Sequence, residues 1–235
     1  MRETVLGRSW EGRPIHVTRI GDPRAPVRVI VMGAIHGNEL AGQAIVARLR
    51  AAPPHLPADV ALWLVDGVNP DGAAAGSRQN ARGVDLNRNF PDGWRRQGVP
   101  GDTFHSGRRP LSEPESRVAA RLIARVRPAV TIWYHQAMAL VDLGTVADRR
   151  VPWRYARTAR LPAVQLPYLP GVATRWQNHT VARSSAFVVE LPAGPLDRAA
   201  VTRHARAVRG AALQARSDRA AGSPGPAGGH ARTVW

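Results

Sequence analysis

The alternation of strand-like and helix-like segments limits the fold of this chain more than any other feature. Short apolar runs rich in β-branched residues, each typical of a buried strand, occupy residues 27–32, 60–65, 130–134 and 186–191. Apolar residues at helical spacing lie between and after them, at residues 39–50, 112–126 and 197–214. This alternation predicts an α/β fold, in which a three-layer α/β/α domain surrounds a mixed, mostly parallel sheet.

Turn residues and loops divide these elements. The Asn-Pro-Asp-Gly sequence at 69–72 predicts a turn, residues 72–110 show no periodicity, and Pro-rich loops are expected over 150–180. Ser112 and Glu115 form the pattern of a capping box, with Ser112 as the helix N-cap. We expect one domain over residues 1–214 and a disordered tail rich in Gly, Pro and Arg over 215–235.

The basic residues are all arginine and give a net charge of +16, while cysteine is absent. The arginines are spread along the chain with few aromatic residues among them. This distribution favours a biased amino-acid supply, or a basic cleft for a small acidic substrate, over a nucleic-acid surface. No apolar run is long enough to span a membrane, and residues 1–10 lack the apolar core of a signal peptide. We therefore expect a cytoplasmic protein with no membrane partner and no nucleic-acid partner.

Polar residues with metal-binding chemistry follow several of the predicted strands. His36, Asn69, His135 and Glu190 lie at or just after strand ends, and the carboxyl ends of parallel strands meet at one edge of a sheet. His36, Glu39 and His135 form a set of two histidines and one carboxylate that leaves a fourth position open, as in several catalytic zinc sites. We expect one zinc ion there, although these ligands also accept other divalent ions.

Five sequence blocks together resemble the zinc carboxypeptidase family. Residues 33–39 read Gly-Ala-Ile-His-Gly-Asn-Glu, residues 69–72 Asn-Pro-Asp-Gly, and residues 83–90 Gly-Val-Asp-Leu-Asn-Arg-Asn-Phe. His135 closes an apolar strand, and residues 187–191 read Phe-Val-Val-Glu-Leu. The blocks follow the order of the family over roughly residues 7–210. The chain is most similar to the short bacterial branch that contains murein peptide amidase, a γ-D-glutamyl–diaminopimelate amidase.

The resemblance implies roles for particular residues. Glu190 would be the catalytic base, and Arg78 would stabilise the oxyanion, although Arg82 in the same loop is an alternative. Asn87 and Arg88 would bind the free carboxylate of the substrate, because a guanidinium binds carboxylate through two parallel hydrogen bonds.

Further residues are assigned to the surroundings of the site. Asp85 is expected to orient a ligand histidine. Tyr168 is the candidate for the family's mobile tyrosine near the leaving group, and Thr174 or Arg175 would read the substrate side chain. His105 and His179 are expected to be surface or structural residues.

The implied activity is a zinc metallopeptidase that hydrolyses the amide next to a residue with a free carboxylate. The expected partner is a small acidic peptide, such as a muropeptide of the γ-D-glutamyl–diaminopimelate type in peptidoglycan recycling. The alternative enzyme is a zinc acylase of N-acylated acidic amino acids, like succinylglutamate desuccinylase or aspartoacylase. An inactive peptide-binding module would lack a ligand or the base, and the sequence contains both.

Overall fold

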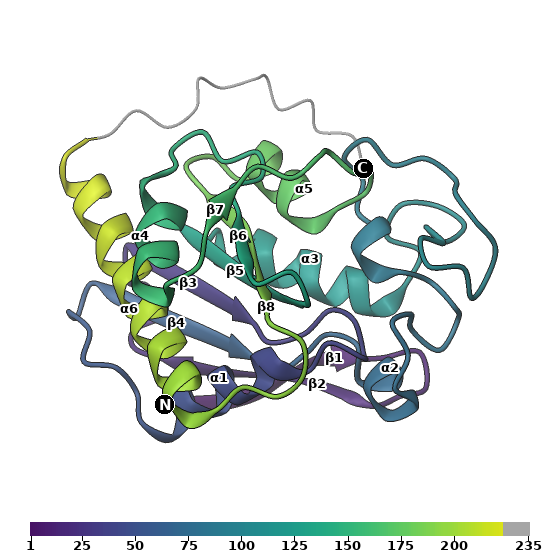
Figure 1. Ribbon diagram of the computed structural model, residues 1–235, viewed down its shortest axis with the longest axis horizontal. Coiled ribbons are helices and arrows are strands. Elements are labelled where there is room, and N and C mark those ends of the chain that lie inside the picture. Colours follow the sequence, from purple (N-terminus) through teal and green to yellow (C-terminus); the bar gives the residue numbers. More distant parts are fainter. Residues whose placement is uncertain (223–235) are drawn as a thin grey trace.

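The computed structural model describes residues 1–222. Within them, the strands form one eight-stranded sheet (Figure 1). In spatial order these are β1 (Arg2–Arg8), β2 (Pro14–Ile20), β4 (Val60–Val65), β3 (Val27–Met32), β5 (Val130–Gln136), β8 (Ser185–Leu191), β6 (Leu140–Asp142) and β7 (Ala163–Val164). The central strands β4, β3, β5 and β8 run parallel, while β1–β2, β2–β4 and β6–β8 pair antiparallel. The expected mixed sheet is confirmed.

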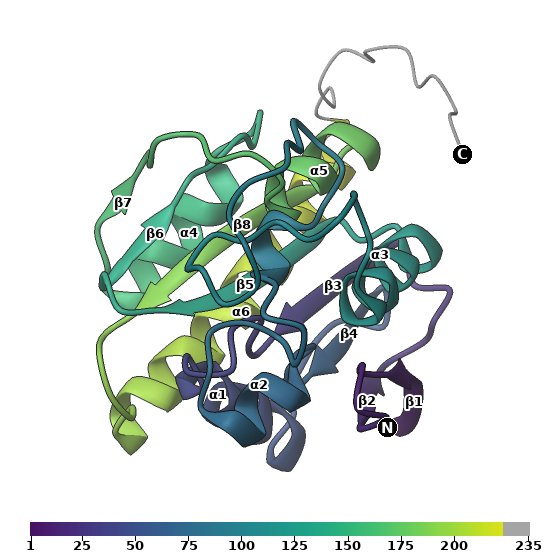
Figure 2. The same ribbon diagram turned by 90° about the vertical axis from the view of Figure 1, so that its right-hand side faces the viewer.

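Helices cover both faces of the sheet, which completes the three layers (Figures 1 and 2). On one face, α1 (Ala41–Ala51), α4 (Arg150–Ala159) and α6 (Arg198–Ala220) contribute to a core with Val29 and Val31 of β3. On the other face, α3 (Pro114–Val126) and the start of α5 (Ala173–Thr180) pack with Ile30 and Met32 of the same strand. Successive residues of a strand point to opposite faces, so an apolar strand supplies both cores.

The predicted turn at residues 69–72 is instead the start of a short helix, α2 (Pro70–Ala75). The Asn69 side chain accepts a hydrogen bond from the backbone N–H of Gly72 at 2.9 Å, as an N-cap does, and Pro70 occupies the first turn. Gly76 ends the helix with a φ of 61°, a conformation that glycine adopts without strain. Asn, Pro and Gly favour both turns and helix ends, which explains the wrong prediction.

The capping box predicted for Ser112 and Glu115 is also wrong. Helix α3 begins at Pro114 with Glu113 as its N-cap residue, and the Glu113 side chain makes no capping hydrogen bond. Ser112 Oγ donates to Glu113 Oε1 at 2.6 Å, while Glu115 Oε1 accepts from the backbone N–H of Trp10 at 2.9 Å. Ser112 therefore bonds to its neighbour, and Glu115 makes a tertiary contact in place of a capping one.

Several elements depart from the sequence prediction. Residues 150–180, expected to be loops, contain α4, β7 and α5. The antiparallel strands β1, β2 and β6 were also not predicted; β1 is mostly exposed, so it lacks an apolar run. Helix α6, capped by Asp197, continues to Ala220 beyond the predicted end at 214. The rest of the predicted tail, residues 223–235, lies outside the described residues. Among residues 1–222, no helix is both long and apolar enough to cross a membrane.

Candidate metal centre and substrate pocket

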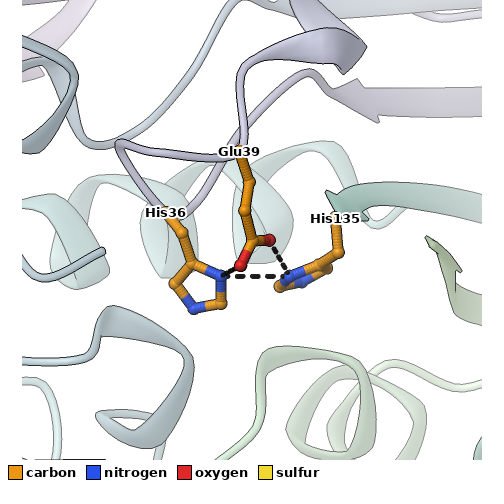
Figure 3. A group of neighbouring side chains, drawn as sticks. All are labelled: His36, Glu39 and His135. Atoms are coloured by element: carbon orange, nitrogen blue, oxygen red, sulfur yellow. Dashed lines mark hydrogen bonds and ion pairs between the residues drawn. The ribbon is translucent and has the colours of Figure 1, made fainter. Parts of the chain in front are cut away.

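Three side chains from different elements converge at the carboxyl edge of the sheet (Figure 3). His36 follows β3, Glu39 precedes α1, and His135 lies in β5. Nδ1 of His36 lies 2.9 Å from Glu39 Oε1, Nδ1 of His135 lies 3.0 Å from Glu39 Oε2, and the two Nδ1 atoms are 3.2 Å apart. All three residues are buried. Their nitrogen and carboxylate donors therefore point to one common position.

The turn between His36 and Glu39 depends on glycine. A Cβ atom on Gly37 would lie 1.9 Å from the carbonyl carbon of Gly72, so no other residue fits against the start of α2. This close approach holds the ligand loop against the neighbouring helix. It explains why a glycine separates the two candidate ligands.

Asp85, which is fully buried, contacts the outer nitrogen of His36. Its Oδ1 lies 3.0 Å from His36 Nε2, which leaves Nδ1 facing the other candidate ligands. Burial alone would lower the pKa of His36, but the carboxylates of Asp85 and Glu39 outweigh it and raise this pKa. Burial would raise the pKa of Glu39, but hydrogen bonds with His135 and His36 outweigh it and lower this pKa. Glu39 is thus a carboxylate, as a metal ligand must be.

Arg78 bridges the two carboxylates beside the candidate ligands. Its Nη1 donates to Glu39 Oε1 at 2.8 Å, and its Nε and Nη2 donate to Asp85 Oδ2 at 3.2 and 3.0 Å. The alternative, Arg82, turns away from the pocket. Its guanidinium lies 4.4 Å from the ring centroid of Trp10, and its Nε is 3.7 Å from Glu113 Oε2. Only Arg78 of this pair lines the pocket with the candidate ligands.

Glu190 lies in the same pocket as the metal centre but does not belong to the group of candidate ligands. It is paired in register with His135 on the adjacent parallel strand, so both side chains project from the same face of the sheet. Its Oε2 is shielded from solvent and has no hydrogen-bond partner among the described residues. Burial, followed by the charge of Glu39, raises the pKa of Glu190 to about 7. This value is suited to a group that takes and returns a proton near neutral pH.

The pocket beside Glu190 also contains Asn87 and Arg88. Asn87 Oδ1 accepts from the backbone N–H of Ala173 at 3.0 Å, which ties its loop to α5. Arg88 is buried, donates from Nη1 to the backbone oxygen of Asn87 at 2.7 Å, and lies 4.8 Å from the ring centroid of Phe104. Among residues 1–222, no carboxylate forms an ion pair with Arg88, so its charge is available to an anionic ligand.

Tyr168, Thr174 and Arg175 line the same pocket. Tyr168 is half-exposed, and the Arg175 guanidinium lies 3.8 Å from the centroid of its ring. Arg175 Nε donates to Asp92 Oδ2, so the guanidinium is held by an ion pair and an aromatic face. Pocket residues that the sequence did not single out include Asp142, Thr145, Gln165 and Val188. Asp142 and Val188 pair across β6 and β8, and the unpredicted strand β6 explains why Asp142 was missed.

His105 and His179 do not join the metal centre. His105 Nδ1 lies within hydrogen-bond distance of the backbone oxygens of Gln97 and Gly98, and exposed His179 contacts Asp92. In the part of the chain that the structure describes, one group of three or more His, Cys, Asp or Glu side chains is close enough to share a metal ion. It consists of His36, Glu39 and His135. Two imidazoles and one carboxylate suit zinc and leave room for a fourth ligand. The donor set therefore fits a catalytic zinc ion.

Comparison with known proteins agrees with this geometry. The profile of the zinc carboxypeptidase family, peptidase M14, matches residues 1–187, which is most of the chain. The chain belongs to the zinc carboxypeptidase family. Murein peptide amidase A of Vibrio campbellii is 32% identical over 179 residues, covering 70% of this chain and 69% of that protein. Murein peptide amidase A of Escherichia coli K12 is 33% identical over 125 residues, and this match spans 48% of the chain and only 50% of the relative.

Solved structures show the same zinc carboxypeptidase fold. Murein-tripeptide amidase MpaA from Escherichia coli O157 superposes with a TM-score of 0.69 at 26% identity, covering 89% of this chain and 92% of that one. Carboxypeptidase A from Helicoverpa armigera gives a TM-score of 0.78 at 20% identity, over 92% of this chain and 68% of that one. A succinylglutamate desuccinylase from Silicibacter gives 0.64 at 17% identity, over 90% and 66%. The last two share the fold, and the fold does not distinguish peptidase from acylase.

Proposed function

We propose that this chain is a zinc-dependent amidase that cleaves the amide bond next to a residue with a free carboxylate, and that its substrate is a muropeptide. The observation that carries the proposal is one pocket that holds three groups of residues: a three-residue metal centre, a carboxylate and a buried arginine. Among residues 1–222, the Oε2 atom of this carboxylate has no hydrogen-bond partner and the arginine has no ion pair. These are a metal site, a base and a carboxylate receptor, the parts that such a hydrolysis requires.

His36, Glu39 and His135 would hold the zinc ion. A bound zinc ion would supply Lewis acidity to activate a water molecule and the scissile carbonyl. Glu190 takes the proton from the attacking water and passes it to the leaving amine. Glu190 lines the pocket, and among residues 1–222 its Oε2 has no hydrogen-bond donor, so this oxygen is free to receive that proton.

Arg78 and Arg88 each interact with a different negative charge in the reaction. Arg78, beside the metal centre, stabilises the charge that develops on the carbonyl oxygen. Arg88 and Asn87 bind the free carboxylate of the leaving residue and so fix which amide bond meets Glu190. Asp85 keeps both His36 and Arg78 in place. Thr174, Arg175 and Tyr168 line the space for the substrate side chain.

The substrate class is supported by relatives whose names are murein peptide amidase A and murein-tripeptide amidase. A γ-D-glutamyl–diaminopimelate bond has a free carboxylate on the leaving residue, as the pocket requires. We further propose that the reaction takes place in the cytoplasm, where it would serve the recycling of peptidoglycan fragments. Fractionation of cells that express the protein would test the location.

The acylase alternative is supported by the shared fold of succinylglutamate desuccinylase. The zinc-loaded protein should be given L-alanyl-γ-D-glutamyl-diaminopimelate, N-succinylglutamate and N-acetylaspartate in parallel, with the chelated protein as control. We expect release of diaminopimelate from the peptide that stops on chelation. Hydrolysis of the acyl amino acids alone would identify an acylase, and hydrolysis of none would refute the amidase.

A further inference from the structure

A buried pair of carboxylates lies behind the loop that carries Arg78 and Asp85, outside the substrate pocket. Glu113 and Glu115, at the start of α3, are both 0% exposed. Their Oε2 atoms accept hydrogen bonds from the same side-chain nitrogen, Nδ2 of Asn80, at 3.0 and 3.1 Å. Burial, and more weakly the charge of Glu113, raise the pKa of Glu115.

The other atoms of Asn80 shape the 78–85 loop. Its Oδ1 accepts from the backbone N–H groups of Arg82 and Val84 at 3.0 and 3.1 Å. Its backbone N–H donates to the Val84 oxygen at 3.0 Å, and its backbone oxygen accepts from Gly83 at 2.9 Å. Asn80 is 4% exposed. One side chain therefore closes the loop on one side and joins it to α3 on the other.

The same loop brings Arg78 and Asp85 together. Arg78 precedes the closed segment and Asp85 follows it, and the two are linked by the hydrogen bonds from Nε and Nη2 to Oδ2. On the Arg78 side, Asn69 Nδ2 donates to the backbone oxygens of Arg78 and Gln79 at 3.3 and 3.1 Å. The loop has no regular secondary structure, so these side-chain hydrogen bonds, together with the backbone bonds of Asn80, Gly83 and Val84, hold its shape.

Stability alone is a poor explanation for two buried carboxylates at this place. Buried charged groups are costly to desolvate, and replacing them with apolar residues is often neutral or stabilising. Carboxylates offer strong, directional acceptors, which an apolar core lacks. We infer that Asn80, held by its hydrogen bonds to Glu113 and Glu115, is a positioning residue. It orients the loop so that Arg78 and Asp85 contact the metal centre. The inference rests on the proposed function for its catalytic readout.

Reversing the direction of the hydrogen bonds tests this inference. In Asn80→Asp, the new carboxylate keeps the shape and can still accept from Arg82 and Val84, but it cannot donate to Glu113 or Glu115. We expect kcat on the γ-glutamyl peptide to fall at least tenfold with zinc content retained and KM changed less than threefold. The triple variant Asn80→Asp/Glu113→Gln/Glu115→Gln restores donors facing acceptors and should recover most of kcat.

A control separates positioning from loss of stability. Val126→Ala opens a cavity at the far end of α3, away from the loop, and should lower the unfolding midpoint without lowering kcat of the folded protein. Full kcat in Asn80→Asp, or no recovery in the triple variant, would overturn the inference. The NMR signal of the Arg78 Nε–H gives a readout without turnover: it should shift in Asn80→Asp and return in the triple variant. Inactive wild-type protein would count against the proposed function, whereas an unshifted Arg78 signal would count against the positioning role.

Discussion

Replacing Asp85 with asparagine should weaken zinc binding without removing any candidate ligand. Asp85 is 0% exposed, and its two oxygens contact His36 Nε2 and two donors of Arg78 at 3.0–3.2 Å. An asparagine keeps one acceptor for His36 but presents N–H groups to the guanidinium, so donors face donors. Loss of such a partner behind a ligand histidine lowers metal affinity by roughly 10–100-fold. That corresponds to about 1.4–2.7 kcal/mol of binding free energy.

The assay is competition for zinc between the protein and a chelator of known affinity, with the metal content measured after dialysis. The matched control is Asp59→Asn, because the Asp59 side chain is 38% exposed and, among residues 1–222, its carboxylate forms an ion pair with Arg216 alone. We expect the control to bind zinc as the wild-type protein does. If Asp85→Asn binds zinc within about twofold of the wild type, Asp85 does not orient His36 and this part of the account is wrong.

Two other predictions concern recognition and pH. Arg88→Gln should raise KM for a substrate with a free carboxylate by roughly 10–100-fold, because a charge-assisted contact worth about 1.5–3 kcal/mol is lost. The KM for a substrate whose carboxylate is amidated should not rise. An equal rise in KM for both substrates would exclude Arg88 as the carboxylate receptor. Burial, then the charge of Arg203, lowers the pKa of His204 to about 4, and its unfolded value is 6.5. A neutral folded histidine stabilises the protein fully above pH 6.5, and up to about 3 kcal/mol is lost as the pH falls toward 4. Denaturant unfolding at pH 7 and pH 5 should show this slope in the wild type and a flatter one in His204→Gln.

The sequence predicted the centre of the sheet well because its strands are buried on both faces. Strands β3, β4, β5 and β8 are continuous apolar runs, and such runs are strong signals. The edge strands carry little of this signal: β1 is largely exposed and β7 spans two residues. Helix α4 was missed because its mean composition is polar, with arginines on the outer side and Val151, Tyr155 and Ala156 facing the core.

The residues of the site also differ in how well they could be predicted from the sequence. His36, His135 and Glu190 could be placed together from the sequence, since each lies at the carboxyl end of a central parallel strand. Arg78 could not be separated from Arg82, because both lie in one irregular loop. Tertiary contacts distinguish them: Arg78 donates to Asp85, whereas Arg82 forms an ion pair with Glu113. Asp142 depends on an antiparallel strand pair, and such long-range pairing leaves no local pattern.

Zinc content and the rate of hydrolysis, measured for Glu190→Gln beside the wild-type protein, distinguish a catalytic base from a metal ligand. We predict one zinc ion per chain in both proteins, because Glu190 is not a ligand. The rate of the variant should be lower by roughly two to four orders of magnitude, because the base is lost. Loss of zinc from the variant would make Glu190 a ligand. A variant that keeps both zinc and the full rate of hydrolysis would contradict the assignment of the base.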